Sequence, residues 1–166
     1  MWPGEQEALL ALIDRIAPAP ECMVEIGVNI GLTAKAVLDH VESIRRYIGI
    51  DVPIGYRFEL AFQQDDRPAE PGHLVKDDAR FRLILRGEEA LPQLSDVVFI
   101  DGDHGPRNVL QDSLWAASVI RSGGLIIWHD YQKTPAEVTG VLDQLYAEGR
   151  KLVHVAETSL VFEQIA

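Results

Sequence analysis

The sequence predicts an α/β fold in which a doubly wound, mostly parallel sheet ends in an antiparallel hairpin of strands. Short apolar runs, typical of strands buried on both faces, alternate along the chain with segments whose apolar residues recur at helical spacing. Such alternation indicates a parallel sheet covered by helices. The last two apolar runs, 151–157 and 159–165, follow each other with almost no link, which permits only antiparallel pairing.

Each element of this fold has its own pattern. The first helical pattern runs from Leu9 to Ile16 and is stopped by Pro18. The expected helices are residues 9–16, 31–41, 106–120 and 134–149. The expected strands before the hairpin are residues 22–28, 45–51, 80–87, 96–102 and 125–130.

The third and fourth helices also carry terminal signals. Gly123 and Gly124 are expected to end the third helix. Thr134 is the expected N-cap of the fourth helix, with Pro135 as its first residue. Glu137, three residues after Thr134, completes a capping box.

The segment 53–78 has the least regular pattern. Its first part, 54–64, favours a helix, whereas 65–78 contains two prolines, a glycine and five acidic residues and reads as a mobile loop. The composition leaves open whether this segment closes over an acceptor or is an ordinary surface loop. Residues 88–94 form a short helical turn at most.

Composition restricts the class of protein. The chain has 166 residues, of which 47% are hydrophobic and 25% charged, and this suits one domain, 1–166, with a sizeable core. The formal net charge of -11 argues against a nucleic acid or an anionic membrane as partner. Cys22 is the only cysteine, so an intrachain disulfide and a cysteine-rich zinc site are excluded. No signal-peptide pattern and no apolar run of about 18–20 residues is present, so we expect a cytoplasmic protein.

Two glycines follow the first expected strand. Gly27 ends the strand and Gly31 begins the next helix, where free backbone N–H groups can meet a ligand. A dinucleotide fingerprint needs two more glycines, but Asn29 and Leu32 stand in their places. The alternative is that these two glycines belong to an ordinary strand-to-helix turn that binds no ligand. Asp51 ends the second strand 24 residues after Gly27, near the offset of about 20 residues at which an acid binds ribose hydroxyls.

The sequence resembles the class I S-adenosylmethionine-dependent methyltransferases on these residues. Glu25, Gly27 and Gly31 match the family's first motif, and Asp51 matches its ribose-binding acid. The resemblance implies a Rossmann-like sheet with an antiparallel last strand and implies S-adenosylmethionine as cofactor. The implied cofactor-binding residues are Glu25, Gly27, Asn29, Gly31, Thr33, Asp51, Glu88 and Asp101.

Polar residues lie at the carboxyl ends of two further expected strands. Asp101 lies at the end of the fourth strand, and His129 and Asp130 end the fifth. Because ligands bind outside the carboxyl ends of parallel strands, we expect these side chains to converge. Two carboxylates and one imidazole suit a cation such as Mg²⁺ or Mn²⁺.

The same stretches resemble a subgroup of small-molecule O-methyltransferases. Residues 99–104, FIDGDH, and 123–131, GGLIIWHDY, match its Ile-Asp-Gly-Asp-His and His-Asp-Tyr segments. The resemblance implies that Asp101, His129 and Asp130 bind a divalent metal and that His104 is the catalytic base. A structural or substrate-contacting role for His104 stays open.

We therefore expect metal-assisted, S-adenosylmethionine-dependent O-methylation of a small hydroxylated molecule of the sugar or natural-product type. Two alternatives remain: an NAD-dependent oxidoreductase and a non-catalytic module that binds S-adenosylmethionine. Asp103 either supports the site or caps the following helix. The sequence does not decide whether the chain forms a homodimer.

Overall fold

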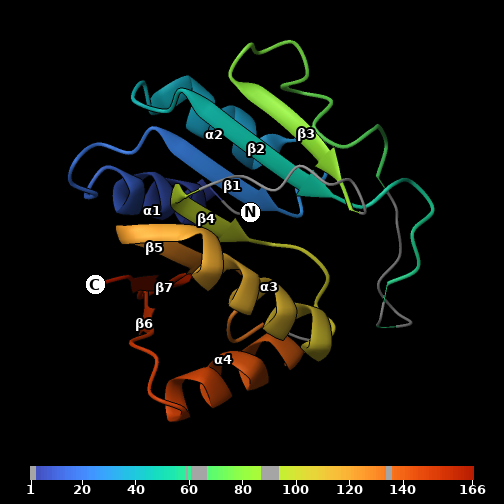
Figure 1. Cartoon of the computed structure of the whole chain (residues 1–166). Coiled ribbons are helices and arrows are strands. Elements are labelled where there is room, and N and C mark those ends of the chain that lie inside the picture. Colours follow the sequence, from blue (N-terminus) through green and yellow to red (C-terminus); the bar gives the residue numbers. More distant parts are fainter. Residues whose placement is uncertain (1–2, 59, 61–66, 87–93, 134–135) are drawn as a thin grey trace.

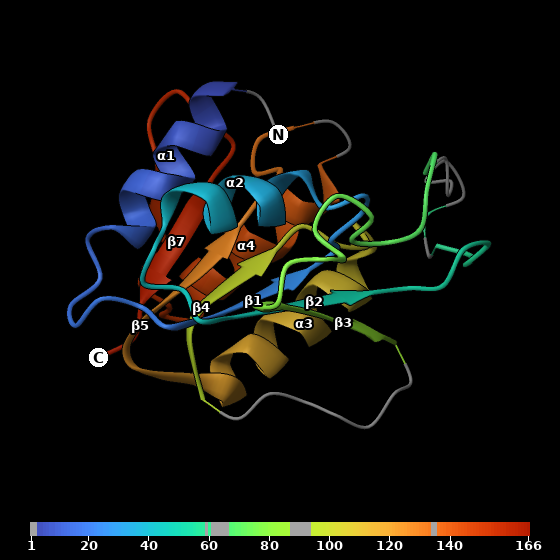
Figure 2. The same ribbon diagram turned by 90° about the horizontal axis from the view of Figure 1, so that it is seen from above.

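A computed structural model of the chain shows one seven-stranded sheet with helices on both faces (Figures 1 and 2). It describes residues 3–58, 60, 67–86, 94–133 and 136–166. The strands are β1 Cys22–Ile26, β2 Arg46–Asp51, β3 Phe81–Leu85, β4 Ser95–Ile100, β5 Ile120–Trp128, β6 Val153–His154 and β7 Val161–Gln164. The helices are α1 Pro3–Ile13, α2 Leu32–His40, α3 Pro106–Val119 and α4 Glu137–Ala147.

The strand order is β3-β2-β1-β4-β5-β7-β6. Strands β1 to β5 pair in parallel, whereas β7 is antiparallel to both β5 and β6. The chain builds the sheet outward from β1 to β3 and then returns to place β4 on the other side of β1. This change of direction between β1 and β4 is where open α/β sheets bind their ligands. The predicted fold class, including the antiparallel C-terminal hairpin, is confirmed.

Apolar side chains fill both faces of the sheet. Helices α1 and α2 lie on one side of it and α3 on the other (Figure 2). On the first side Ile13 and Val37 belong to the same buried cluster as Phe99. On the second, Leu142 of α4 packs in the cluster that contains the fully buried Trp128. All five residues of β1 are buried, as its mostly apolar sequence predicts.

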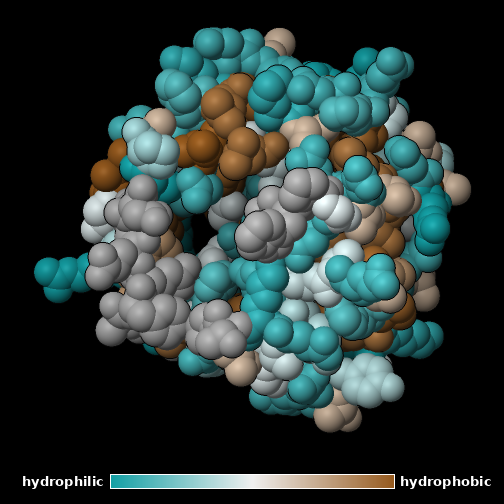
Figure 3. Space-filling model, turned by 180° about the vertical axis from the view of Figure 1, so that it is seen from behind, coloured by the Kyte–Doolittle hydropathy of each residue, from teal (hydrophilic) through white to brown (hydrophobic). Residues whose placement is uncertain are grey.

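The outer surface is mostly polar, as Figure 3 shows for the face seen from behind. Large apolar side chains that are exposed among the described residues are Leu32, Ile54, Leu74, Leu94, Leu114, Tyr146 and Val153. None of the helices in the described part of the chain is both long enough and apolar enough to cross a membrane.

The expected end of the third helix is wrong. Helix α3 ends at Val119 and strand β5 begins at the next residue, so Gly123 and Gly124 lie inside the strand. A Cβ atom on Gly124 would lie 2.8 Å from the carbonyl oxygen of Asp96. Glycine is therefore needed for close approach to β4, where the register of the two strands shifts, rather than for ending a helix.

Two other local expectations also change. Helix α4 begins at Glu137 with Ala136 as its N-cap, so Glu137 is the first helical residue and cannot complete the expected capping box. Thr134 and Pro135 lie outside the described residues. The expected helix over 54–64 is not formed in residues 54–58 and 60, the part of it that the structure describes.

Candidate active site

Backbone hydrogen bonds extend the sheet beyond its strand ends and bring the candidate residues together. The Gly27 N–H donates to the Ile50 carbonyl at 2.8 Å, and the Asp101 N–H donates to the Ile26 carbonyl at 2.8 Å. These bonds place the ends of β1, β2 and β4 side by side at the carboxyl edge of the sheet. The residues predicted from separate sequence segments therefore share one edge.

Gly27 lies where the loop after β1 meets the backbone of the residues that follow β4. Its φ is +88°, and a Cβ atom built on it would lie 2.1 Å from the carbonyl oxygen of Asp101. No other residue fits there, because a side chain would collide with backbone and the left-handed conformation favours glycine. Gly31, at φ +93°, is the N-cap of α2 and leaves that helix without a side-chain cap. The loop thus keeps backbone N–H groups at a helix N-terminus available for a ligand.

The segment 71–77, part of the expected mobile loop, is a series of turns that is hydrogen-bonded to the glycine loop, residues 27–31. The Gly72 N–H donates to the Asn29 carbonyl at 2.8 Å, and the Leu74 N–H donates to the Ile30 carbonyl at 2.9 Å. Val75 is buried in the core beneath it. This part of the segment is therefore a fixed support for the loop.

Donors from three residues, among the contacts described, orient the Asp51 carboxylate. Its Oδ2 accepts the Asn29 N–H at 2.7 Å, and its Oδ1 accepts the Val52 N–H at 2.6 Å. The Arg67 guanidinium donates to Oδ1 at 2.9 Å, and both side chains of this ion pair are more than nine-tenths buried. The carboxylate therefore points toward the glycine loop, as a ribose-binding acid requires, with Arg67 as its charged partner.

Glu25 lies beneath the glycine loop, where it is 1% exposed. It accepts a hydrogen bond from the Tyr47 hydroxyl at 2.8 Å. Burial raises the pKa of the Glu25 carboxyl well above its usual range, against the opposing effect of its hydrogen bonds to Tyr47 and Thr33. The structure thus places Glu25 and the buried Thr33 under the loop.

Asp103 fixes the loop before α3. Its Oδ1 accepts the Gly105 N–H at 2.8 Å and its Oδ2 accepts the Asn108 side-chain amide at 3.0 Å. Gly105 is the N-cap of α3 and has no side chain with which to cap the helix. Asn108 also accepts a hydrogen bond from Arg86, the residue after β3. Glu88, expected near the adenine, lies outside the described residues.

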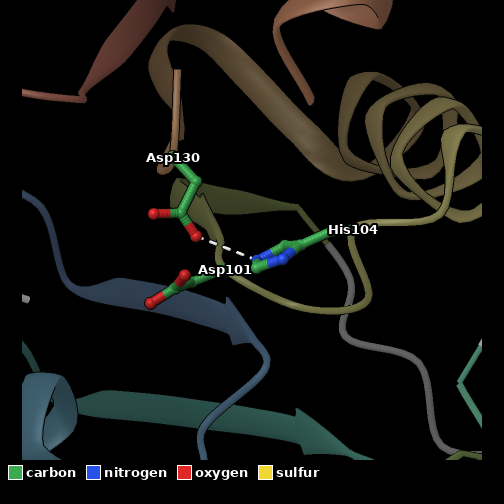
Figure 4. Close-up of side chains that lie close together, drawn as sticks. All are labelled: Asp101, His104 and Asp130. Atoms are coloured by element: carbon green, nitrogen blue, oxygen red, sulfur yellow. Dashed lines mark ion pairs between the residues drawn. The ribbon is translucent and has the colours of Figure 1, made fainter. Parts of the chain in front are cut away.

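Asp101, His104 and Asp130 form the acid–imidazole cluster of Figure 4. Asp101 follows β4, His104 lies in the loop before α3, and Asp130 follows β5. One ligand atom from each lies within 4.8 Å of the others, and His104 Nε2 is 2.9 Å from Asp130 Oδ2. The three residues line a small cleft whose wall includes Trp128 and Val138. The arrangement can hold a proton or offer two oxygens and a nitrogen to a cation.

His129 lies deeper than this cluster and is 7% exposed. Its Nδ1 is 3.0 Å from Asp101 Oδ1 and 3.1 Å from Asp130 Oδ1, and its Nε2 is 3.2 Å from Glu5 Oε2. Both ring nitrogens face carboxylates, so in this arrangement each can donate a hydrogen to a carboxylate rather than offer a lone pair to a cation. In this arrangement the third ligand for a cation comes from His104. Metal binding by Asp101, His129 and Asp130 stays a prediction.

Hydrogen bonds shift the pKa values of His104, His129 and Asp130. The bond to Asp130 raises the pKa of His104 above its usual value. Burial lowers the pKa of His129, but hydrogen bonds to Asp101 and Asp130 outweigh it and raise the pKa to about 10. Burial also opposes ionisation of Asp130, yet its bonds to the two histidines hold the pKa of that carboxyl well below its usual range. These shifts favour the protonated imidazole of His129 and the ionised carboxyl of Asp130.

Comparison with known proteins identifies the class of protein that this fold and site define. The model of a protein family described as "Methyltransferase domain" matches residues 24–131, which is more than half of the chain and includes the glycine loop and the acid–imidazole cluster. The chain belongs to this family of methyltransferase domains. Among curated proteins, none matches its sequence.

Solved methyltransferase structures share the fold at low sequence identity. The O-methyltransferase NovP is 15% identical with a TM-score of 0.70, and the match covers 98% of this chain and 79% of that one. CalS11, a calicheamicin methyltransferase described in a second structure as a TDP-rhamnose 3'-O-methyltransferase, is 16% identical with a TM-score of 0.70, covering 97% and 78%. An O-methyltransferase from Bacillus cereus in complex with SAH (S-adenosylhomocysteine) is 16% identical with a TM-score of 0.63, covering 99% and 82%.

The resemblance to class I methyltransferases is therefore confirmed for the family and the fold. The narrower resemblance to the Ile-Asp-Gly-Asp-His subgroup and the roles of individual site residues stay predictions.

Proposed function

We propose that this protein transfers a methyl group from S-adenosylmethionine to a hydroxyl group of a small acceptor. The observation that carries the proposal is the contact between Gly27 and the backbone of Asp101, because it makes the glycine loop and the acid–imidazole cluster parts of one site. The site also lies at the change of strand direction, where ligands bind in such sheets.

The residues present fit the cofactor. Gly27 gives close backbone approach, the N-terminus of α2 has no side-chain cap, and the Asp51 carboxylate can accept hydrogen bonds from two vicinal hydroxyls. We expect Gly27, Asn29 and Gly31 to line the cofactor, with Glu25 and Thr33 supporting the loop from below. When bound, the cofactor supplies an electrophilic methyl group on a sulfonium.

His104 is the proposed catalytic base. Asp130 accepts the Nε2–H of the ring, which orients the imidazole and stabilises the charge that it gains. The acceptor's hydroxyl proton would move to Nδ1, the nitrogen opposite the one that Asp130 holds. Because Asp130 raises the pKa of His104, the base strengthens, and turnover is expected to rise with pH until His104 is neutral.

Metal assistance is the second candidate, favoured by the close approach of ligand atoms from Asp101, His104 and Asp130. Two carboxylates with one imidazole suit Mg²⁺ or Mn²⁺. A cation held there would lower the pKa of an acceptor hydroxyl and orient it. For His104 the roles of ligand and base compete, so dependence on a divalent cation decides between the two mechanisms.

Calorimetric titration with S-adenosylhomocysteine tests the proposal. We expect binding to wild type and at least about tenfold weaker binding to Asp51→Asn, since a charged hydrogen bond contributes about 1.5–3 kcal/mol. Asp39→Asn is the matched control, because Asp39 is half-exposed on α2 and pairs only with Lys35 among the contacts described. Thermal unfolding is followed for each variant, since Asp51→Asn also removes the ion pair with Arg67.

Two further arms separate the alternatives. Binding of NADH in place of S-adenosylhomocysteine would favour the oxidoreductase and overturn the proposal. If the cofactor binds, methyl transfer is measured with TDP-rhamnose and simple catechols as first acceptors, with and without Mg²⁺ or Mn²⁺. Turnover that persists in a chelator but is lost in His104→Gln supports the metal-free base. Turnover that requires the cation and is lost in Asp101→Asn supports metal assistance.

A further inference from the structure

A carboxylate from the N-terminal helix reaches the candidate active site. Glu5 lies in the first turn of α1, yet its side chain is buried and its Oε2 is 3.2 Å from His129 Nε2, 124 residues along the chain. An acid in the first turn of a helix ordinarily points to solvent near the helix dipole. Glu5 instead joins α1 to the carboxyl end of β5.

The other oxygen of Glu5 is held as firmly. Its Oε1 accepts the Ser159 N–H at 3.0 Å and the Ser159 hydroxyl at 2.6 Å, and the Lys133 ammonium lies 3.3 Å away. Ser159 precedes β7 and is itself buried. The backbone N–H and the hydroxyl of Ser159, together with the Lys133 ammonium, thus hold the carboxylate, while Oε2 is directed at His129.

His129 passes this orientation on to the acids of the cluster. Once Nε2–H is held by Glu5, the ring can place Nδ1–H only toward Asp101 and Asp130, whose Oδ1 atoms lie 3.0 and 3.1 Å away. Asp130 in turn meets His104 through its second oxygen, Oδ2. A continuous series of hydrogen bonds therefore runs from α1 to the proposed base.

We propose that Glu5 is a positioning residue, which orients the ring of His129 so that Asp101 and Asp130 are held in the geometry that His104 requires. Buried charged groups are expensive to keep, and a carboxylate with this many dedicated partners is typical of sites whose supporting groups fix the reacting ones. This role for Glu5 rests on the proposed function, because Asp130 affects turnover only if His104 acts as the catalytic base or as a metal ligand.

The test uses Glu5→Gln, with Glu7→Gln as the matched control, since Glu7 is exposed on the same helix. The ring signals of His129 and His104 are followed by NMR on protein labelled with ¹⁵N-histidine, at pH 7 and without cofactor, and assigned with His129→Gln and His104→Gln. In wild type and Glu7→Gln we expect a slowly exchanging Nε2–H on His129. In Glu5→Gln its exchange should be about tenfold faster, the factor expected for losing one hydrogen bond to a charged group.

The signals of His104 distinguish positioning from simple support of the fold. If Glu5 acts through His129 and Asp130, the ¹⁵N shifts of the His104 ring change in Glu5→Gln and stay unchanged in Glu7→Gln. A change at His129 with none at His104 would overturn the proposal. Ser159→Ala, which removes only the hydroxyl donor to Glu5, should move the same signals less and serves if Glu5→Gln does not fold.

Calorimetry with S-adenosylhomocysteine on the same samples distinguishes a failure of the role proposed for Glu5 from a failure of the proposed function. We expect the affinity of Glu5→Gln to match wild type within about twofold, because Glu5 makes no contact with the glycine loop among the described hydrogen bonds. Absence of binding to wild type would overturn the cofactor, whereas the NMR result would still decide the role of Glu5.

Discussion

Replacing Gly27 by alanine should destabilise the protein, because no room exists for a Cβ atom between the ends of β1 and β4. The new atom would lie 2.1 Å from the Asp101 carbonyl oxygen and 2.6 Å from the Gly102 Cα, both of which are backbone. A flexible side chain could move aside, but these neighbours are backbone atoms. The paired ends of β1 and β4 must therefore separate to admit the new atom. The change therefore disturbs the fold and the proposed active site together.

The magnitude has two parts. An alanine at φ +88° costs about 1–2 kcal/mol because its Cβ crowds the following carbonyl. Forcing a methyl group into a packed position costs about 1–3 kcal/mol more. We expect a total loss of about 2–5 kcal/mol in the free energy of unfolding.

Gly149→Ala is the matched control, since Gly149 has φ +102° but nothing within 4 Å of a Cβ. It should show only the conformational part, about 1–2 kcal/mol. Urea unfolding followed by circular dichroism gives both free energies, and the slopes show whether the transition stays two-state. Equal losses in the two variants would refute the steric argument, and with it the contact on which the proposed site depends.

Three further changes test separate parts of the structure. Glu25→Gln should alter the free energy of unfolding at pH 7 by less than about 1 kcal/mol, because burial raises the pKa of Glu25 and so favours its neutral form, and the amide can still accept from Tyr47; a loss of several kcal/mol in urea unfolding would contradict this. Burial raises the pKa of Asp112 to about 6 from 3.8, so the folded state holds this proton more tightly and stability falls as pH rises through that window. Asp112→Asn should therefore be more stable than wild type at pH 8, by at most about 3 kcal/mol, and lose less stability between pH 4 and 7; parallel profiles would refute this. Arg67→Met removes the ion pair of Asp51, so S-adenosylhomocysteine should bind about tenfold more tightly in calorimetry, and unchanged or weaker binding would show that Arg67 does not compete with the ribose.

The sheet could be predicted because its signals are local. Apolar strand sequences, helical spacing and the short link before β7 each depend on neighbouring residues, and together they determine the order of parallel and antiparallel pairing. The strand-end rule then brings Asp51, Asp101 and Asp130 to one edge. These residues could be singled out because each directly follows or ends a strand.

The supporting contacts could not be predicted in the same way. Glu5 and Arg67 are ordinary charged residues in their own segments, and only the packing of distant elements brings them to His129 and Asp51. Likewise, the composition of 71–77 indicates a mobile loop, although Val75 in this segment is buried in the hydrophobic core. A single sequence carries no pattern for such long-range partners.

The structural role of Gly123 and Gly124 cannot be predicted from the sequence for a related reason. Two adjacent glycines usually end a helix, and their sequence context contains nothing that distinguishes a helix end from a crowded strand. The close approach of Gly124 to the backbone of β4 is a tertiary contact, visible only once both strands are placed.

The most direct test of the proposed cofactor site is a crystal structure of the protein with S-adenosylhomocysteine. We expect the ribose hydroxyls to donate to the Asp51 carboxylate, Arg67 to move away from Oδ1, and the sulfur to lie between the glycine loop and Asp101. A cofactor bound elsewhere, or a ribose without contact to Asp51, would contradict it.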